Sequence, residues 1–512
     1  MSNDNIVTNN ADALAARPRM HVPESNGRGL IVLRTSRVVA GAGVVAAGAL
    51  AWVALGLGGA FRASSETGTP TARTTPAPAA TTTTTQAQST NSDPNRYPFG
   101  APSGGAAVNV PSPPGEPTLA PTIATRTTTR LYGANPFEEA VSVTQHIWPA
   151  ALPENAANES NASDRPRGVT LLTPDDPLTA ITATPLIHFP DDAPVLYVTR
   201  EGIPGVTLNE LKRLGVTGMA RYNNVDAFLV GAAANPGVEN QLKAIGMKYV
   251  TVTAGSIPDL ANKVDQLYGS IQNPDTGVPV MDSCAQDVVV GSMDAYQYLL
   301  PATHWVAHMA SGLLWVTRDS VPQATRDALK RRNGMARIYL FGGSAQISSA
   351  VAKQLAQYGA VIRITNDDEV GYNAPPTDNA IDTAITFAKM WDAAGEMGWK
   401  ITGPGHGFTL VNINDWQGAV ASAPLSHLGF HAPLLLTDTA TDLPSQVQGY
   451  LTSVAPTFLS TPADGPYNMT YVLGSWDQIS WPQQTHVDAV SEMGNRRFWG
   501  TTTGGRYSDS QP

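Results

Sequence analysis

Apolar runs too short to be helices recur along the C-terminal two thirds of the chain, each followed by a segment of helical composition. The clearest example begins with Phe408–Val411, an apolar run that predicts a buried strand. Asn414 or Asp415 then stands where a helix cap is needed, before a helix expected over Gln417–Leu428. Leu434–Leu436 predicts a second strand, so the stretch forms one strand–helix–strand unit.

The same pattern occurs three times at constant offsets, which indicates an internal repeat. Val169–Thr199 aligns with the first example without a gap, since Pro185 lies 239 residues before Pro424. A further copy begins at Asp287, 118 residues after the corresponding part of the first. Each copy of roughly 100 residues is expected to run strand–helix–strand–helix–strand–helix–strand.

The fold expected for each copy is α/β, with a parallel sheet and helices on both faces. The expected strands are continuously apolar, as in sheets buried on both sides, and their connections should be right-handed. The boundaries predicted from the offsets are 168–281, 282–400 and 401–512 for the first, middle and third copies.

The N-terminal third predicts an anchor and a spacer. Residues 38–61 are free of charge and long enough to cross a bilayer, and arginines precede them in the tail 1–37. The positive-inside rule then leaves the tail in the cytoplasm and the rest of the chain outside, as a single-pass protein of the cell surface. A cleaved signal peptide is the competing interpretation. Residues 62–167, rich in Pro, Thr and Ala, predict a disordered linker, in which Phe137, Ile147 and Trp148 are candidates to pack on the folded part.

Charge and cysteine content exclude several classes of function. The formal net charge of −10 argues against general nucleic-acid binding. The single cysteine, Cys284, excludes an intramolecular disulfide and a cysteine-based metal site. No nucleophile elbow, His-Glu-x-x-His or dinucleotide fingerprint occurs, which favours a binding protein without cofactor over an enzyme.

Several short motifs recur at equivalent places in the copies. These are Asp176, Ala193–Leu196 and Val230-Gly231 in the first copy; Asp294-Ala295, Gly312–Leu314 and Tyr339–Gly343 in the middle copy; and Asp415, Ala432–Leu436, Leu443-Pro444 and Tyr471–Gly474 in the third. In this combination the chain resembles the cell-wall-binding repeat 2 family of bacterial surface proteins. The resemblance covers about residues 168–493. It implies three tandem Rossmann-like modules in a trimer-like arrangement that hold the protein on anionic polysaccharide of the cell envelope.

One segment of the family pattern, Arg-x-x-Gly-x-x-Arg-Tyr-x-Thr-Ala after the last strand, is poorly kept. The middle copy has Arg363 and, after a longer loop, Thr377 and Ala380, and the other two copies lack the segment. The third copy also has Gly474-Ser475 in place of Gly-Gly.

Candidate ligand-binding residues lie where strands end, because ligands of parallel α/β sheets bind at that edge. Asp176, Asp294 and Asp415 could contact a saccharide or a cation, although a helix cap needs the same residue type. The turn Gly342-Gly343-Ser344 could hold an anion or simply be tight. Arg200, Arg318 and Arg363 could pair with phosphate or carboxylate groups, and Arg200 and Arg318 could equally pair with Glu201 and Asp319.

Histidines also match across copies. His188 and His427 are equivalent, and His304 and His308 lie nearby in the middle copy. They could meet at a threefold centre and bind a metal, but packing or surface roles are the commoner use of such residues.

The sequence therefore predicts a non-catalytic surface protein whose triplicated head binds envelope polysaccharide. One alternative is a structural or self-associating head, which an exposed apolar face carrying Trp476, Trp481 and Trp499 would favour. The other is an α/β enzyme acting on a glycan or nucleotide ligand, which a cleft with converging Asp, His and Arg side chains would favour.

Overall fold

A computed structural model describes residues 122–150, 164–188, 191–269, 286–364, 379–427 and 430–495. The expected span 38–61 lies outside these ranges and stays a prediction. Within the described ranges no helix has both the length and the apolar character needed to cross a bilayer. All the described residues belong to one compact unit of the chain, which begins at Ser92.

The first sheet is parallel and contains four strands in the order β4-β3-β5-β6. The strands are β3 (Val169–Leu172), β4 (Val195–Tyr197), β5 (Ala227–Val230) and β6 (Tyr249–Val252). Every residue of the three strands β3, β4 and β5 is buried, as the continuous apolar runs predict.

The second sheet repeats this order with β8-β7-β9-β10, again all parallel. Its strands are β7 (Asp287–Ser292), β8 (Gly312–Val316), β9 (Ala336–Phe341) and β10 (Gly359–Arg363). In both sheets the chain enters at an inner strand, moves to one edge, and then returns across the first strand to build the other edge.

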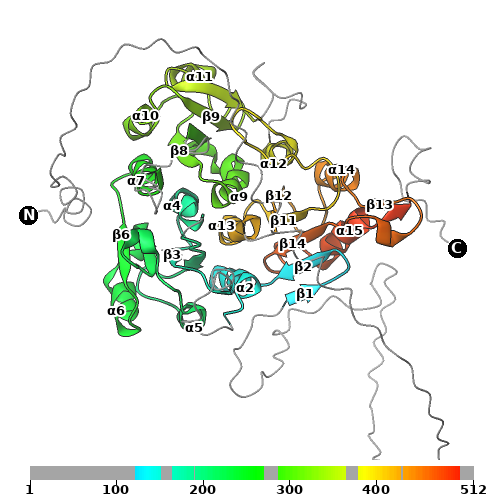
Figure 1. Cartoon of the computed structure of the whole chain (residues 1–512), viewed down its shortest axis with the longest axis horizontal. Coiled ribbons are helices and arrows are strands. Elements are labelled where there is room, and N and C mark those ends of the chain that lie inside the picture. The colour runs from blue at the N-terminus through cyan, green and yellow to red at the C-terminus, as the bar shows by residue number, and fades with distance from the viewer. Residues whose placement is uncertain are drawn as a thin grey trace, which may run out of the picture. The chain divides into compact units, whose positions relative to one another are not determined.

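The third sheet has the order β12-β11-β14-β2-β1, so its outer strands come from the opposite end of the described chain. Its members are β11 (Gly407–Asn412), β12 (Leu434–Thr437), β14 (Met469–Leu473), β2 (Thr128–Leu131) and β1 (Thr122–Ala124). Strand β2 pairs parallel with β14, where the other sheets have their fourth strand, and β1 is antiparallel to β2. Figure 1 shows the cyan strands β1 and β2 beside the orange and red third sheet.

This pairing corrects the expectation that residues 62–167 are a linker without regular structure. Residues 122–147 form β1, β2 and the helix α2 (Pro136–Ile147). Ile147 and Trp148 are buried, as expected, and Phe137 is partly buried against the core. The strand β2 reads Thr-Thr-Arg-Leu and has no apolar run to reveal it, yet all four residues are buried.

The helices connect the strands and cover the sheets. After α2 they are α4 (Pro177–Ala183), α5 (Gly205–Leu214), α6 (Pro236–Ala244), α7 (Ile257–Gly269), α9 (Leu300–His308), α10 (Gln323–Lys330), α11 (Ser349–Leu355), α12 (Ala380–Lys389), α13 (Trp416–Ala421), α14 (Ser445–Ser453) and α15 (Trp481–Ser491). Short 3-10 helices are η2 (Thr184–Ile187), η3 (Ala220–Tyr222), η4 (Gly231–Ala233), η5 (Met293–Leu299), η6 (Ala423–Ser426) and η7 (Pro462–Asp464), and β13 (Thr457–Phe458) pairs with β15 (Gly494–Asn495).

The helix expected over Gln417–Leu428 is shorter than predicted. Asp415 caps α13 as expected, accepting from the Gly418 amide at 3.0 Å. The α-helix ends at Ala421 and the chain continues as the 3-10 helix η6. Pro424 explains the change, because it has no amide hydrogen to continue the α-helical ladder.

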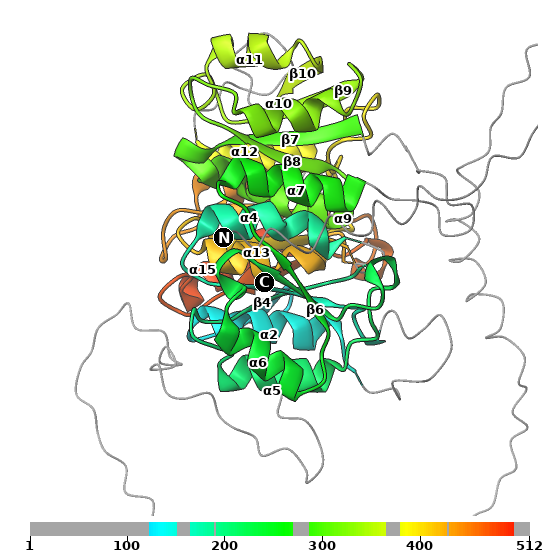
Figure 2. The ribbon, with the colours of Figure 1, turned by 90° about the vertical axis from the view of Figure 1, so that its left-hand side faces the viewer.

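The helix after the fourth strand of each sheet packs against the next sheet. Helix α7 contacts β8 and α10, α12 contacts β12 and α14, and α2 contacts β4 and α5. Figure 2 shows α7 beside β8, and α2 beside β4 and α5. Helices α4, α9 and α13, which follow the first strands, also contact one another through α13 and the 3-10 helices. The N-terminal segment thus closes a ring of contacts among the sheets.

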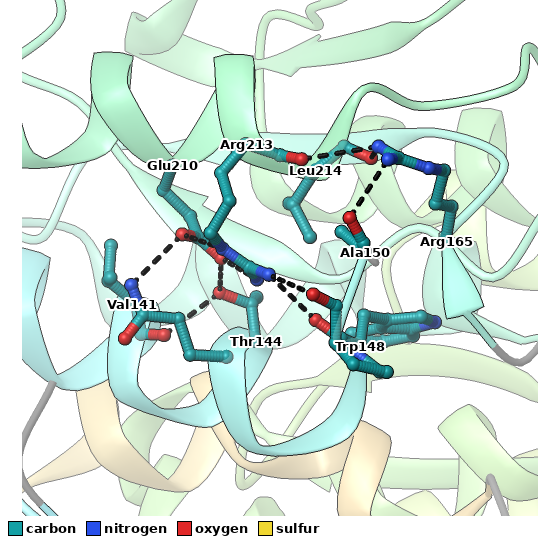
Figure 3. A network of polar contacts seen from close by, with 10 residues as sticks. Val141, Thr144, Trp148, Ala150, Arg165, Glu210, Arg213 and Leu214 are labelled. Carbon is teal, nitrogen blue, oxygen red and sulfur yellow. Dashed lines mark hydrogen bonds and ion pairs between the residues drawn. The ribbon is translucent and has the colours of Figure 1, made fainter. Parts of the chain in front are cut away.

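A polar network fastens α2 to α5 at this closure (Figure 3). Glu210 accepts a hydrogen bond from Thr144 at 2.6 Å and pairs with Arg213 at 2.7 Å. Arg213 also donates to the Trp148 carbonyl oxygen at 2.9 Å, and Arg165 donates to the Leu214 carbonyl oxygen at 2.7 Å. Both side chains of the Glu210–Arg213 pair are nearly buried. Thr144 and the Trp148 carbonyl oxygen, in and just after α2, provide hydrogen-bond partners for them.

Candidate functional site

The three aligned aspartates occupy different environments. Asp176 caps α4, accepting from the Thr179 amide at 3.2 Å and hydroxyl at 2.7 Å. Asp294 is exposed and accepts from the Arg318 amide at 2.9 Å. Asp415 is buried at the start of α13. Capping therefore accounts for Asp176, which is partly buried, and for Asp415, whereas Asp294 is exposed.

Asp415 faces a second carboxyl group, Glu139 of α2, which sequence reasoning missed. Both side chains are buried. Apart from a hydrogen bond between the two carboxyl groups, Glu139 Oε1 and Asp415 Oδ2 have no hydrogen-bond partner within the described residues. Burial, followed by the charge of Asp415, raises the pKa of Glu139 well above its usual range, and burial also raises the pKa of Asp415. The two carboxyl groups therefore meet in the interior, where they join α2 to α13.

Arg200 and Arg318 lie at the surface after the second strands of their sheets. The Arg200 side chain is 57% exposed and contacts Asp175 at 2.6 Å. The Arg318 side chain is 55% exposed and contacts Asp319 at 2.9 Å. Asp294 and Arg318 thus come together, and Arg200 lies with Asp175 rather than with Glu201. Such exposed pairs contribute little stability, so their partners can be exchanged at low cost.

Arg363 is buried, which corrects its placement on a ligand-binding surface. It donates to the Gly342 carbonyl oxygen at 2.7 Å and to the Ile347 carbonyl oxygen at 2.9 Å. The Gly343 amide donates to Gln346 Oε1 at 3.0 Å, so it serves the turn and is not directed at an anion. Gly342 has a φ of 118°, which explains the glycine, and Ser344 follows in the same turn.

Arg130 of β2 makes the same contacts in the third sheet. It donates to the carbonyl oxygens of Gly474 at 2.8 Å and Ile479 at 2.6 Å, and the Ser475 amide donates to Gln478 Oε1 at 2.7 Å. Each turn residue lies 132 positions after its counterpart around Gly342, and Gly474 also has a positive φ, of 89°. The Gly474-Ser475 departure therefore leaves the geometry of the turn unchanged.

A signal for Arg130 was present in the sequence. Arg130, Gly133 and Ala140 have the spacing of the Arg-x-x-Gly-x-x-Arg-Tyr-x-Thr-Ala segment, with Pro136, Phe137 and Glu139 at the other specified positions. The strand that carries this spacing, β2, pairs with β14 and so joins the third sheet from the other end of the described chain. A Cβ atom at Gly133 would lie 2.2 Å from the Glu139 amide nitrogen, which explains the glycine.

His188, His308 and His427 lie near one another, whereas His304 does not join them. The ring centres of His188 and His427 are 5.2 Å apart, and those of His308 and His427 are 6.2 Å apart. His304 is instead buried, with Nδ1 donating to the Ala432 carbonyl oxygen at 2.8 Å and Nε2 accepting from Ser422 at 3.2 Å. In the described ranges no three His, Cys, Asp or Glu side chains are arranged to hold a metal ion.

Comparison with known proteins gives a likeness of fold. No family model matches the chain, and no curated protein does. Among solved structures, Cwp6 from Clostridium difficile matches 72% of this chain with a TM-score of 0.52 at 18% identity. Cwp8 from Clostridium difficile also matches 72% of this chain, with a TM-score of 0.51 at 13% identity. The match spans about half of each of those proteins, 48% and 52% respectively.

Proposed function

We propose that the described part of the chain is built from three copies of one Rossmann-like repeat closed into a ring. The equivalent order of four parallel strands in each of the three sheets supports this proposal. The arginine-held turns of Arg363 and Arg130, whose residues lie 132 positions apart, support it further. Strand β2 then supplies the last strand of the third copy, and the boundaries 168–281, 282–400 and 401–512 omit this contribution.

This head belongs, in our proposal, to a non-catalytic protein of the cell surface that binds anionic envelope polysaccharide. The fold likeness to Cwp6 and Cwp8, which are cell wall proteins, supports the location. The expected membrane span 38–61 and the linker after it would hold the head outside the cell.

The observation that carries polysaccharide binding is the pair of exposed arginines at equivalent strand ends. Arg200 and Arg318 lie 118 residues apart and after the second strands of their sheets, each paired with an exposed carboxylate. A polymer with repeated phosphate or carboxylate groups can replace those carboxylates and contact both arginines, because guanidinium groups bind such oxyanions through paired hydrogen bonds.

Retention of the full chain on isolated wall polymer tests this function. The Arg200→Ala, Arg318→Ala double variant should bind about ten-fold more weakly at low salt, which corresponds to about 1.4 kcal/mol. Lys330→Ala is the matched control, because its side chain is also 57% exposed and paired with a carboxylate, at 3.1 Å. No retention of the native chain at low salt would contradict the proposal, as would equal losses in the double variant and the control.

Two of the three tryptophans expected on an exposed apolar face lie among the described residues, and both are partly buried. Trp476 packs against Trp481 with ring centres 5.7 Å apart, and it lies 4.0 Å from the Arg130 guanidinium. These two indoles therefore contact each other and the buried Arg130, and Trp499 lies outside the described residues.

A further inference from the structure

A pocket of about 320 Å³ lies between the end of α9, the loop before β11 and the loop before β12. Its walls include three indoles and three imidazoles, from Trp305, Trp391, Trp399, His308, His406 and His431. The volume is at the lower end of the range for small-molecule sites and suits a single ring-sized ligand. We call it the indole pocket.

The aromatic wall of the indole pocket is fixed by mutual packing. His308 stacks on Trp399 with ring centres 5.1 Å apart and planes 23° apart. Trp305 meets Trp399 edge to face at 5.3 Å, and His431 meets His308 at 4.7 Å. Trp391, with 36% of its surface exposed, adds an indole that solvent can reach. Rigid aromatic faces bind flat apolar surfaces at little entropic cost.

The polar atoms that a ligand could reach belong to the exposed residues of the pocket. Trp399 Nε1 and His308 Nδ1 have no hydrogen-bond partner among the described residues, but both atoms are buried, so no solvent-sized group in the pocket reaches them. Glu396 and His431 are exposed and His406 is partly exposed, so their carboxylate and ring nitrogens are available to a ligand with hydroxyl groups.

The electrostatic character of the pocket excludes an anion as the favoured ligand. The residues described as lining it include no Arg or Lys, and Glu396 is its one carboxylate. Burial, and then the neighbouring histidines, lower the pKa of His308 to about 3. Burial also lowers the pKa of His431 and of His406. The imidazoles are therefore neutral at pH 7 and offer hydrogen bonds without positive charge.

The backbone of the pocket is held in uncommon conformations. Glu396 and His431 have φ values of 50° and 47°, in the left-handed region that residues other than glycine rarely adopt. The Glu396 turn is fastened to β9 through Asp392, which pairs with Arg337 and accepts from the Tyr339 hydroxyl at 2.7 Å. Strain of this kind persists where the surrounding structure enforces it and is frequent at ligand sites.

We infer that the indole pocket binds one uncharged sugar ring. The indoles would cover the apolar face of the ring, and His406, His431 and Glu396 would contact its hydroxyl groups. The inference rests on the proposed function and refines it, since the arginines would contact the charged groups of a polymer and the pocket a neutral residue of it.

The test uses the full chain and simple probes. Saturation-transfer NMR and tryptophan fluorescence would be recorded with the methyl glycosides of glucose, galactose, mannose and N-acetylglucosamine, and with glycerol 3-phosphate as the anionic comparison. We expect at least one glycoside to bind with a Kd on the order of millimolar. Glycerol 3-phosphate should give no signal that depends on the pocket.

Trp391→Ala and Glu396→Gln should each weaken glycoside binding at least about ten-fold. Glu396→Gln should leave the melting temperature unchanged, because its side chain is exposed and nearly isosteric with the native one. Met335→Ala is the control, because Met335 is 58% exposed and does not line the pocket. The inference is overturned if no glycoside binds at about 50 mM, which is far above the expected Kd. It is also overturned if both variants bind like the native chain.

The wall-polymer experiment separates this inference from the proposed function. Polymer retention that depends on Arg200 and Arg318, without any glycoside binding, would overturn the inference about the indole pocket and support the proposed function. Glycoside binding that depends on Trp391, without retention on polymer, would overturn the proposed function and support the inference that the indole pocket binds a sugar ring.

Discussion

At the scale of single residues, the most informative side chains are buried arginines that bind backbone carbonyl oxygens. Arg130 and Arg363 each hold the turn that follows the third strand of a sheet. A guanidinium group suits this task because it offers several donors in a fixed plane, and in the interior its charge is spread over carbonyl dipoles. Arg130 lies in β2 and Arg363 in β10, and their matching hydrogen bonds show that the two strands hold equivalent places in their sheets. This evidence is more specific than the strand order alone.

Removing either arginine should destabilise the protein severely. Arg130→Ala and Arg363→Ala should each lower the free energy of unfolding by about 3–5 kcal/mol, because buried carbonyl oxygens lose their donors. Urea unfolding measures the change.

Arg200→Ala is the control for these variants, because its ion pair is exposed, and its stability should change by less than about 0.5 kcal/mol. A loss in Arg363→Ala as small as that of the control would show that the turn does not depend on the arginine.

At the scale of elements, β2 and α2 are the parts on which the third sheet depends. Strand β2 covers the edge of β14, and α2 packs on β4 and α5 through the Glu210–Arg213 network and meets α13 through Glu139. Without them β14 would present unpaired backbone groups, a known route to aggregation.

A chain that begins at residue 164 should therefore be unstable and prone to associate, whereas a chain that begins at residue 115 should behave like the full chain. We expect the melting temperature of the shorter chain to fall by about 10 °C or more, from the loss of several kcal/mol of packing and hydrogen bonds. Scanning calorimetry and size-exclusion chromatography measure both effects.

Adding a peptide of residues 118–150 should restore part of the lost stability, since the segment binds through its own strand and helix. A shorter chain that is monomeric and melts with the longer one would contradict the assigned role of β2.

At the scale of the whole molecule, the interior holds titratable groups of both types in their neutral forms. Burial lowers the pKa of His304 to about 4 and, with its histidine neighbours, that of His308 to about 3. Burial raises the pKa of Asp287 to about 8, against the lowering effect of Arg337. Because the histidines must become charged in acid, their contribution to the free energy of unfolding is lost as the pH falls below about 6.5. The contribution of Asp287 is lost in the other direction, as the pH rises from about 4 to 8.

Between pH 6.5 and 8 the ionisation of the histidines no longer changes the free energy of unfolding. The buried carboxyl groups therefore determine how the free energy of unfolding varies with pH in this interval. The free energy of unfolding should fall across this interval by on the order of 2 kcal/mol for Asp287 alone. Asp287→Asn should reduce the slope, because the amide does not ionise. Thermal unfolding at a series of pH values measures it, and an unchanged slope in Asp287→Asn would mean that Asp287 is already ionised in the folded state.

The sequence alone determined the elements whose signals are local. The continuous apolar runs of β3, β8, β11 and β12 and the cap at Asp415 depend on neighbours a few residues away, and the constant offsets revealed that the pattern recurs. These features follow from burial and from helix-end hydrogen bonds, which a short stretch of sequence specifies.

Only the tertiary structure decided where polar segments go. β2 carries two threonines and an arginine, and it becomes an interior strand because its partners β14 and the Gly474 turn lie more than 300 residues away. The burial of Glu139 and the assembly of the indole pocket likewise depend on segments brought together by the fold. A polar side chain can be buried where the fold provides its hydrogen-bond partners. A short stretch of sequence does not indicate partners that lie hundreds of residues away.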